Sequence, residues 1–110
     1  MKKQLLKGGL LDTVLLDLIS GEGEQGLHGY ALILLLRKKF HVYISASTLY
    51  PELKKIEENG YISSSWNFSD DRPRHLYRIT DSGQKLLKQY FVELKMIIPL
   101  MQNREIYRED

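Results

Sequence analysis

The hydrophobic periodicity of the chain switches at Asn59-Gly60 from about 3.6 residues, typical of helices, to about 2, typical of strands. Glycine suits the end of a helix because it adopts the left-handed backbone conformation without a steric penalty. Before the switch, apolar residues recur at helical spacing in three segments. The predicted helices cover about residues 9–20, 28–40 and 47–58.

After the switch, the chain predicts a β-hairpin and then one more helix. Residues 62–68 alternate between two faces, and residues 75–80 return as a second strand behind a polar, arginine-containing loop. The last helix begins at Asp81, where Gln84 is placed to complete a capping box. The fold class is therefore mainly α with a small β-hairpin.

Two of the predicted helices carry further expectations. The segment 28–40 is apolar nearly all round, which predicts that it is buried centrally. The segment 47–58 begins near Ser47, whose hydroxyl can cap free backbone amides, so Pro51 falls about the first turn, where a missing N–H costs little. The inward face of this helix consists of Leu49, Leu53 and Ile56.

Three helices followed by a hairpin form the winged helix-turn-helix arrangement, in which the third helix enters the DNA major groove and the hairpin is the wing. The chain carries eight Lys or Arg and five acidic residues between positions 37 and 78. Each of these charges alone would be an ordinary surface charge, but together they favour a polyanionic partner. The expected DNA-contacting residues are Ser47, Thr48, Tyr50, Lys54, Lys55, Arg72 and Arg74. Tyr50 fits flank packing and a phosphate contact equally well.

Several short motifs stand at the ends of the predicted elements. They are Leu6-Lys7-Gly8, His28-Gly29-Tyr30, Ser47-Thr48-Leu49-Tyr50-Pro51-Glu52-Leu53, Asn59-Gly60-Tyr61-Ile62, and Tyr77-Arg78-Ile79-Thr80 followed by Gly83. Over about residues 5–90, the chain resembles the PadR family of bacterial transcriptional regulators. The resemblance implies a homodimeric repressor that binds an inverted-repeat operator in double-stranded DNA through the third helix and the wing. Ser47 stands where the family commonly has glycine, which we expect to change local groove contacts and not the fold.

In its short length, the chain resembles members of the PadR subfamily that have a single C-terminal dimerisation helix. We therefore expect a winged helix-turn-helix domain at residues 5–80, a dimerisation helix at 81–102 and a disordered tail at 103–110. Pro99 is expected to kink or end the last helix near Ile98.

The last helix also predicts dimerisation from its own pattern. Five apolar residues are spaced four, three, four and three apart, like the seam of a coiled coil, and three more broaden the stripe. The seam is Leu87, Phe91, Leu94, Ile98 and Met101, broadened by Leu86, Tyr90 and Ile97. Alternatively, the stripe packs only on its own domain.

A ligand role rests on the resemblance alone. Some PadR proteins bind flat hydrophobic drugs between their subunits on tryptophans of the last helix, whereas the tryptophan here, Trp66, lies on the first wing strand. Tyr90 and Phe91 remain as candidates to line a cavity for a hydrophobic or aromatic effector.

Other functional classes have less support. The three histidines, His28, His41 and His75, lie on separate elements without metal-ligand spacing, and no catalytic constellation is visible, so we expect neither an enzyme nor a cofactor nor a metal. The absence of cysteine and of any long apolar run favours a cytoplasmic protein that does not enter a membrane. A winged helix that contacts protein or RNA, without binding an operator, remains the alternative.

Overall fold

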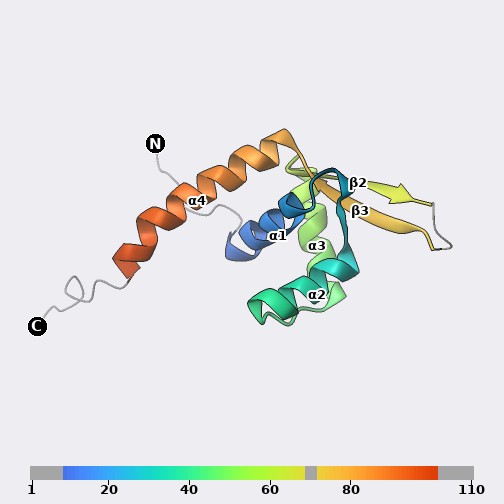
Figure 1. Ribbon diagram of the computed structural model, residues 1–110, viewed down its shortest axis with the longest axis horizontal. Coiled ribbons are helices and arrows are strands. Elements are labelled where there is room, and N and C mark those ends of the chain that lie inside the picture. Colours follow the sequence, from blue (N-terminus) through green and yellow to red (C-terminus); the bar gives the residue numbers. More distant parts are fainter. Residues whose placement is uncertain (1–8, 69–71, 102–110) are drawn as a thin grey trace, which may run out of the picture.

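The computed structural model describes residues 9–68 and 72–101, and this part of the chain contains four α-helices and a three-stranded antiparallel sheet (Figure 1). The helices are α1 (Gly9–Gly21), α2 (Gly29–Phe40), α3 (Ala46–Glu58) and α4 (Asp81–Met101). The strands are β1 (Leu27–His28), β2 (Ile62–Asn67) and β3 (Arg74–Ile79), with one turn of 3-10 helix at Gly23–Gln25. The predicted fold class is confirmed. The expected leading segment before residue 9, the centre of the wing loop and the tail at 103–110 lie outside the described residues.

The core lies where α1, α2 and α3 meet, beside the sheet (Figure 1). The inward face predicted for α3 is confirmed, because its three apolar residues are at most 2% exposed. They pack with apolar side chains of the two preceding helices. The innermost members of the core are Leu15, Ile19, Leu32, Leu36, Leu49, Leu53 and Ile56.

The prediction that α2 is buried centrally is wrong. Only Gly29, Leu32 and Leu36 of this helix are buried, whereas Tyr30 and Leu34 are 62% and 42% exposed. The apolar residues surround the helix, but α2 lies at one side of the domain, so only one face meets the core (Figure 1).

Helix α3 begins earlier than predicted. Its N-cap is Ser45, whose backbone carbonyl accepts the N–H groups of Thr48 and Leu49 at 3.1 and 3.0 Å. Pro51 consequently lies in the second turn, where it removes the donor that would otherwise bond the Ser47 carbonyl. The helix tolerates this because Ser47 and Pro51 are both exposed, so water can satisfy that carbonyl.

The strand β1 was not expected from the sequence. It pairs with β3, so that Leu27 lies opposite Tyr77 and the sheet order is β1-β3-β2. A two-residue strand is too short to show any alternation. Its pairing joins the start of α2 to the wing, which matters for the site described below.

The end of α3 and the start of α4 are tied to each other. Gly60, with φ of 82°, allows Tyr61 N–H to bond the Ile56 carbonyl at 3.2 Å, and the Thr80 hydroxyl donates to the Gly60 carbonyl at 2.6 Å. The Thr80 hydroxyl also accepts the Gly83 N–H at 3.0 Å. Thr80 therefore caps α4.

The predicted capping box between Asp81 and Gln84 is wrong because Thr80 occupies the capping position. The Gln84 side chain instead accepts a hydrogen bond from the Ser20 hydroxyl at 3.4 Å. Helix α4 continues through Pro99 to Met101, so of the kink or end expected near Ile98, the end does not occur. Pro99 is exposed, which leaves the carbonyl that it cannot bond open to solvent.

Gly83 is required by close packing. A Cβ at this position would collide with the Tyr61 backbone carbonyl and approach Ile79 Cγ1 to 2.7 Å. We expect Gly83→Ala to lower the free energy of unfolding by about 1–3 kcal/mol, as is typical of overpacking, in urea denaturation followed by circular dichroism.

Gly21→Ala is the matched control. It adds a methyl group at a helical glycine with nothing within 4 Å. We expect it to be neutral or stabilising, because glycine in a helix is disfavoured by about 0.5–1 kcal/mol relative to alanine. Equal stability of the two variants would show that Gly83 is not a packing position.

Candidate nucleic-acid interface

Three elements meet at an exposed hollow of about 260 Å³ beside the wing. Residues from the start of α2, the middle of α3 and the arm of the wing leading into β3 line it. Three of the predicted DNA-contacting residues, Tyr50, Arg72 and Arg74, are brought together here. The complete lining is His28, Gly29, Tyr30, Tyr50, Arg72, Pro73, Arg74 and His75.

Tyr50 joins α3 to the start of α2. Its ring lies against Gly29, where a Cβ would collide with the Tyr50 hydroxyl and ring, and Tyr50 is still 42% exposed. The two roles weighed for Tyr50 from the sequence are therefore compatible, because the ring packs while part of the residue stays accessible. The two sequence motifs that contain Gly29 and Tyr50 contact each other in the fold.

His28 holds the start of α2 beside the wing. It is the N-cap, and its Nδ1 accepts the Ala31 N–H at 3.2 Å. Burial, together with the Arg74 guanidinium, lowers the pKa of His28, so the ring is neutral at pH 7. Since Nδ1 accepts, the single proton of a neutral ring sits on Nε2. The Arg74 Nη1 atom at 3.5 Å from Nε2 then makes no hydrogen bond to the ring.

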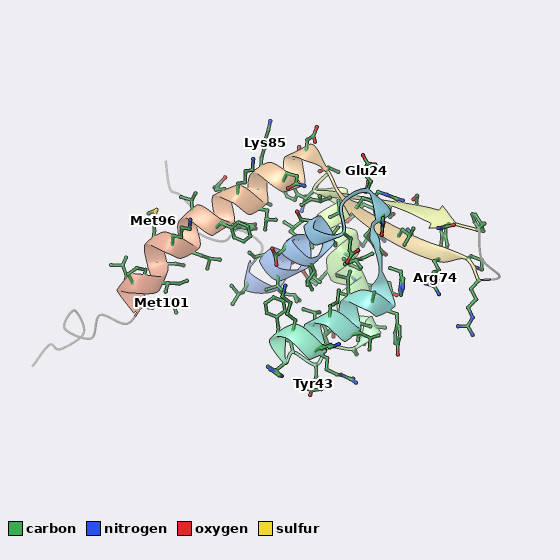
Figure 2. The ribbon with its side chains drawn as sticks, viewed as in Figure 1. Glu24, Tyr43, Arg74, Lys85, Met96 and Met101 are labelled. Carbon is green, nitrogen blue, oxygen red and sulfur yellow. The ribbon has the colours of Figure 1, made fainter. Side chains whose placement is uncertain are left out.

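Arg74 and Arg72 carry the positive charge of this hollow. Both are exposed, and Arg74 lies on the wing beside the start of α2 (Figure 2), with its Nη1 3.5 Å from His28 Nε2. The free N–H groups at the start of a helix add a partial positive charge to the same region. The hollow thus presents guanidinium groups and a helix N-terminus together.

The outer face of α3 continues this surface. Ser47, Thr48 and Lys54 are exposed, and Ser47 and Lys54 lie opposite the buried face of the helix. The hydroxyls of Ser47 and Thr48 lie 2.9 and 3.3 Å from the Ser45 hydroxyl. Short hydroxyl side chains and one lysine suit close approach to a groove.

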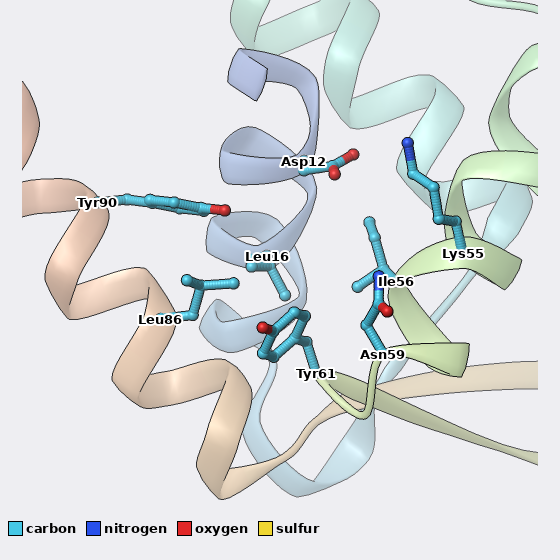
Figure 3. Close-up of a pocket in the computed structure, with 8 residues that line it drawn as sticks. All are labelled: Asp12, Leu16, Lys55, Ile56, Asn59, Tyr61, Leu86 and Tyr90. Carbon is cyan, nitrogen blue, oxygen red and sulfur yellow. The ribbon is translucent and has the colours of Figure 1, made fainter. Parts of the chain in front are cut away.

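Lys55 differs from the other predicted contacts in its ion pairing. Its Nζ is 3.2 Å from Glu52 Oε2, on the flank of α3 that faces α1, and it lines a partly open cavity with Asp12 (Figure 3). Lys55 is one helical step from Lys54, and 100° of rotation separates their directions. The structure therefore brings six of the seven predicted residues to the α3 and wing surface. Lys55 lies on the same exposed flank of α3 as Thr48, but its ammonium group is paired with Glu52.

Sequence reasoning missed part of the hollow. Five of its eight lining residues were not predicted there: His28, Gly29, Tyr30, Pro73 and His75. No periodicity could have placed the three at the start of α2, since the pairing of β1 with β3 brings them to the wing. His75 stacks on Trp66 at 4.7 Å between ring centroids, and Trp66 also stacks on Phe68 at 6.3 Å. Trp66 is 57% exposed, so it covers the outer face of the wing strands.

The apolar stripe of α4 divides into two parts. Leu87 and Tyr90 are only 4% and 1% exposed because they pack against α1 in their own domain, so neither side chain is available to a partner. Leu86 is half-buried in the same place. Tyr90 also points toward α1 in Figure 3, whereas Phe91 is 41% exposed, so the two do not line one cavity.

The remaining part of the stripe lies on the half of α4 that extends away from the other helices (Figures 1 and 2). Leu94 and Ile97 are half-buried and the rest are 41–71% exposed. The exposed apolar residues of this half are Phe91, Val92, Met96, Ile98, Leu100 and Met101.

Two other kinds of site are absent from residues 9–68 and 72–101. No helix in these ranges has the length and hydrophobicity needed to span a membrane. No group of three or more potential metal-ligating side chains occurs among them either.

Comparison with known proteins agrees with the fold and identifies the family. The family model "Transcriptional regulator PadR-like family" matches residues 15–89. The protein "Transcriptional regulator Rv3488" of Mycobacterium tuberculosis (strain ATCC 25618 / H37Rv) is 32% identical over 78 residues, which are 70% of this chain and 71% of that protein. The chain belongs to the PadR-like family of transcriptional regulators.

Solved structures of the family have the same fold. A PadR-like transcriptional regulator from Bacillus cereus has a TM-score of 0.76 at 27% identity, over 98% of this chain and 100% of that one. Bacillus subtilis PadR, solved in complex with operator DNA, has a TM-score of 0.65 at 25% identity, over 74% of this chain and 46% of that one. The fold and family are thus those of transcriptional regulators.

Proposed function

We propose that the protein is a homodimeric repressor that binds an inverted-repeat DNA operator through α3 and the wing. The observation that carries this proposal is the hollow that joins Tyr50 of α3 to Arg72 and Arg74 of the wing. The operator complex of Bacillus subtilis PadR supports it, because that protein shares the fold. The proposed site of action is chromosomal DNA in the cytoplasm, without catalysis.

The proposed contacts divide into two kinds. Arg72, Arg74 and the start of α2 present positive charge suited to phosphates, which fix the position of a protein on DNA. Ser47, Thr48 and Lys54 face outward from α3 and are suited to base edges in the major groove. Tyr50 lies between the two groups and is assigned to a phosphate.

Dimerisation is proposed through the projecting half of α4. Six large apolar residues are exposed there in a single chain, and exposed apolar surface of this extent marks an interface. A second copy offers the same surface, as the two-fold symmetry of an inverted repeat requires. The proposed seam consists of Phe91, Leu94, Ile97, Ile98 and Met101. Phe91 is also the residue of the predicted effector pair that remains accessible to a hydrophobic or aromatic ligand between subunits.

The salt dependence of binding tests the phosphate contacts. Each neutralised phosphate contributes about −0.9 to the slope of log affinity against log salt concentration. We expect Arg74→Ala to make this slope shallower by about one and to weaken binding to all sequences alike, measured by fluorescence anisotropy.

Lys88→Ala provides the matched control, because it removes one exposed positive charge from α4, away from the wing. Its slope should equal that of the unaltered protein. If Arg74→Ala and Lys88→Ala gave the same slope, Arg74 would not contact a phosphate.

A further inference from the structure

A second cavity, of about 260 Å³, lies inside one subunit, between α1, α3 and α4 (Figure 3). It is separate from the DNA-facing hollow and from the proposed dimer seam. Its walls combine apolar and aromatic side chains with the carboxyl group of Asp12 from α1 and the polar side chains of Lys55 and Asn59 at the end of α3. The principal lining residues are Asp12, Leu16, Ile56, Tyr61, Leu86 and Tyr90.

Asp12 is the unusual member of this lining. It is 6% exposed, and its Oδ1 atom has no hydrogen-bond partner, the one such buried side-chain atom found over residues 9–68 and 72–101. A buried polar atom without a partner is destabilising by about 1–3 kcal/mol, so such atoms are rare and need a reason. A donor group that enters the cavity can supply the missing hydrogen bond.

The charges around Asp12 indicate which donor fits. The other half of its carboxyl group is hydrogen-bonded to Glu52, and Lys55, the nearest cation, is paired with Glu52 at 3.2 Å. Tyr90 on α4 and Tyr61 after α3 face the cavity with aromatic rings, which attract cations. An anionic ligand would meet two carboxyl groups and a lysine that already has a partner.

We propose that this cavity binds a small molecule with a protonated amine on an apolar or aromatic body, the amine bonding Asp12 and the body lying against Leu16, Leu86 and Tyr90. The volume lies just below the usual range of about 300–1,000 Å³ for ligand pockets, so the ligand is small. A ligand held there contacts α3 and α4 together. The proposal concerns ligand binding alone and does not depend on DNA binding.

Protonation of Asp12 makes the binding dependent on pH. Burial, then hydrogen bonding and repulsion from Glu52, raises the pKa of Asp12 to about 7, while the hydrogen bond from Asp12 lowers the pKa of Glu52. Glu52 is thus the ionised partner. An alkylammonium group, like that of lysine, stays charged in this range. Because the amine pairs best with ionised Asp12, its affinity should rise with pH through about 7 and then level off.

Calorimetry with three probes of one shape tests the proposal. Benzylamine, benzyl alcohol and benzoate share a ring and differ in charge. We expect benzylamine to bind at least tenfold more tightly than the other two at pH 8, and at least tenfold more tightly than at pH 5.5. Equal affinities for the three probes, tighter binding of benzoate, or no benzylamine binding would overturn the proposal, while DNA binding would be unaffected.

Variants locate the site. Asp12→Asn keeps the size of the side chain and a donor to Glu52 but removes the charge, so it should abolish the preference for the amine over the alcohol. Glu22→Gln is the matched control, since it makes the same change at an exposed position after α1. Leu86→Phe should block the cavity and weaken benzylamine at least tenfold, which keeps the test decisive if Asp12→Asn is unstable. Undiminished benzylamine binding by Leu86→Phe or by folded Asp12→Asn would place the ligand elsewhere.

Discussion

Ile98→Glu should convert the protein from a dimer to a folded monomer and weaken operator binding by about 10²–10⁴-fold. Ile98 is 52% exposed within one chain and lies on the projecting half of α4, so the substitution leaves the domain core unchanged. In a dimer the same carboxylate would be buried unpaired in an apolar seam, which is destabilising by several kcal/mol. The measurements are circular dichroism for folding, sedimentation velocity for mass and anisotropy for affinity.

The large loss follows from the way a dimer binds an inverted repeat. Once one subunit is on its half-site, the second binds at a high effective concentration, and a monomer loses that gain. Lys85→Glu is the control, since it introduces a carboxylate at an exposed position near the start of α4 (Figure 2). It should remain dimeric. If Ile98→Glu also remained dimeric, or bound the full operator normally as a monomer, α4 would not be the seam.

Lys54→Ala should cost about 1–3 kcal/mol of binding free energy on the preferred operator and much less on random DNA. Lys54 points outward from α3, opposite Leu49 and Ile56, where a base edge can be reached. The affinities for both DNAs are to be measured at one fixed salt concentration, because the phosphate contribution depends on salt.

Lys55→Ala is the matched control, because it removes the same positive charge from the adjacent position of α3. Lys55 is paired with Glu52 and faces α1, so its loss should change neither affinity by more than a few-fold. A uniform loss for Lys54→Ala on all sequences would make Lys54 a phosphate contact. A specific loss for Lys55→Ala would mean that the helix presents its other flank to DNA.

Much of the fold could be predicted because its signals are local. The inward face of α3, the end of that helix at Gly60 and the strands of the wing follow from short-range periodicity and glycine chemistry. Three predictions about the fold were missed or wrong, each for a physical reason. Strand β1 has two residues, which are too few to show a periodicity. Thr80, and not Asp81, caps α4. Helix α2 lies at the edge of the domain, although its apolar composition is typical of a central helix.

The candidate site was less predictable because it depends on tertiary contacts. The residues on α3 and the wing could be named from their chemistry, but the packing of Tyr50 against Gly29 required the fold. The sequence does not distinguish Lys54 from the adjacent Lys55, whereas the structure shows that their side chains leave the helix in different directions. Likewise, the heptad spacing of α4 does not distinguish Leu87, which its own domain buries, from Ile98, which stays exposed.

The most direct test of the DNA-binding function is to sequence the DNA that the protein captures from the genome of its own organism at physiological salt. Two winged helices related by two-fold symmetry should enrich an inverted repeat whose half-sites are about one helical turn, or a whole number of turns, apart. A duplex of that sequence should compete at least 10³-fold better than the same duplex with its bases shuffled. Captured fragments without a shared motif, or equal competition by the shuffled duplex, would contradict a sequence-specific regulator.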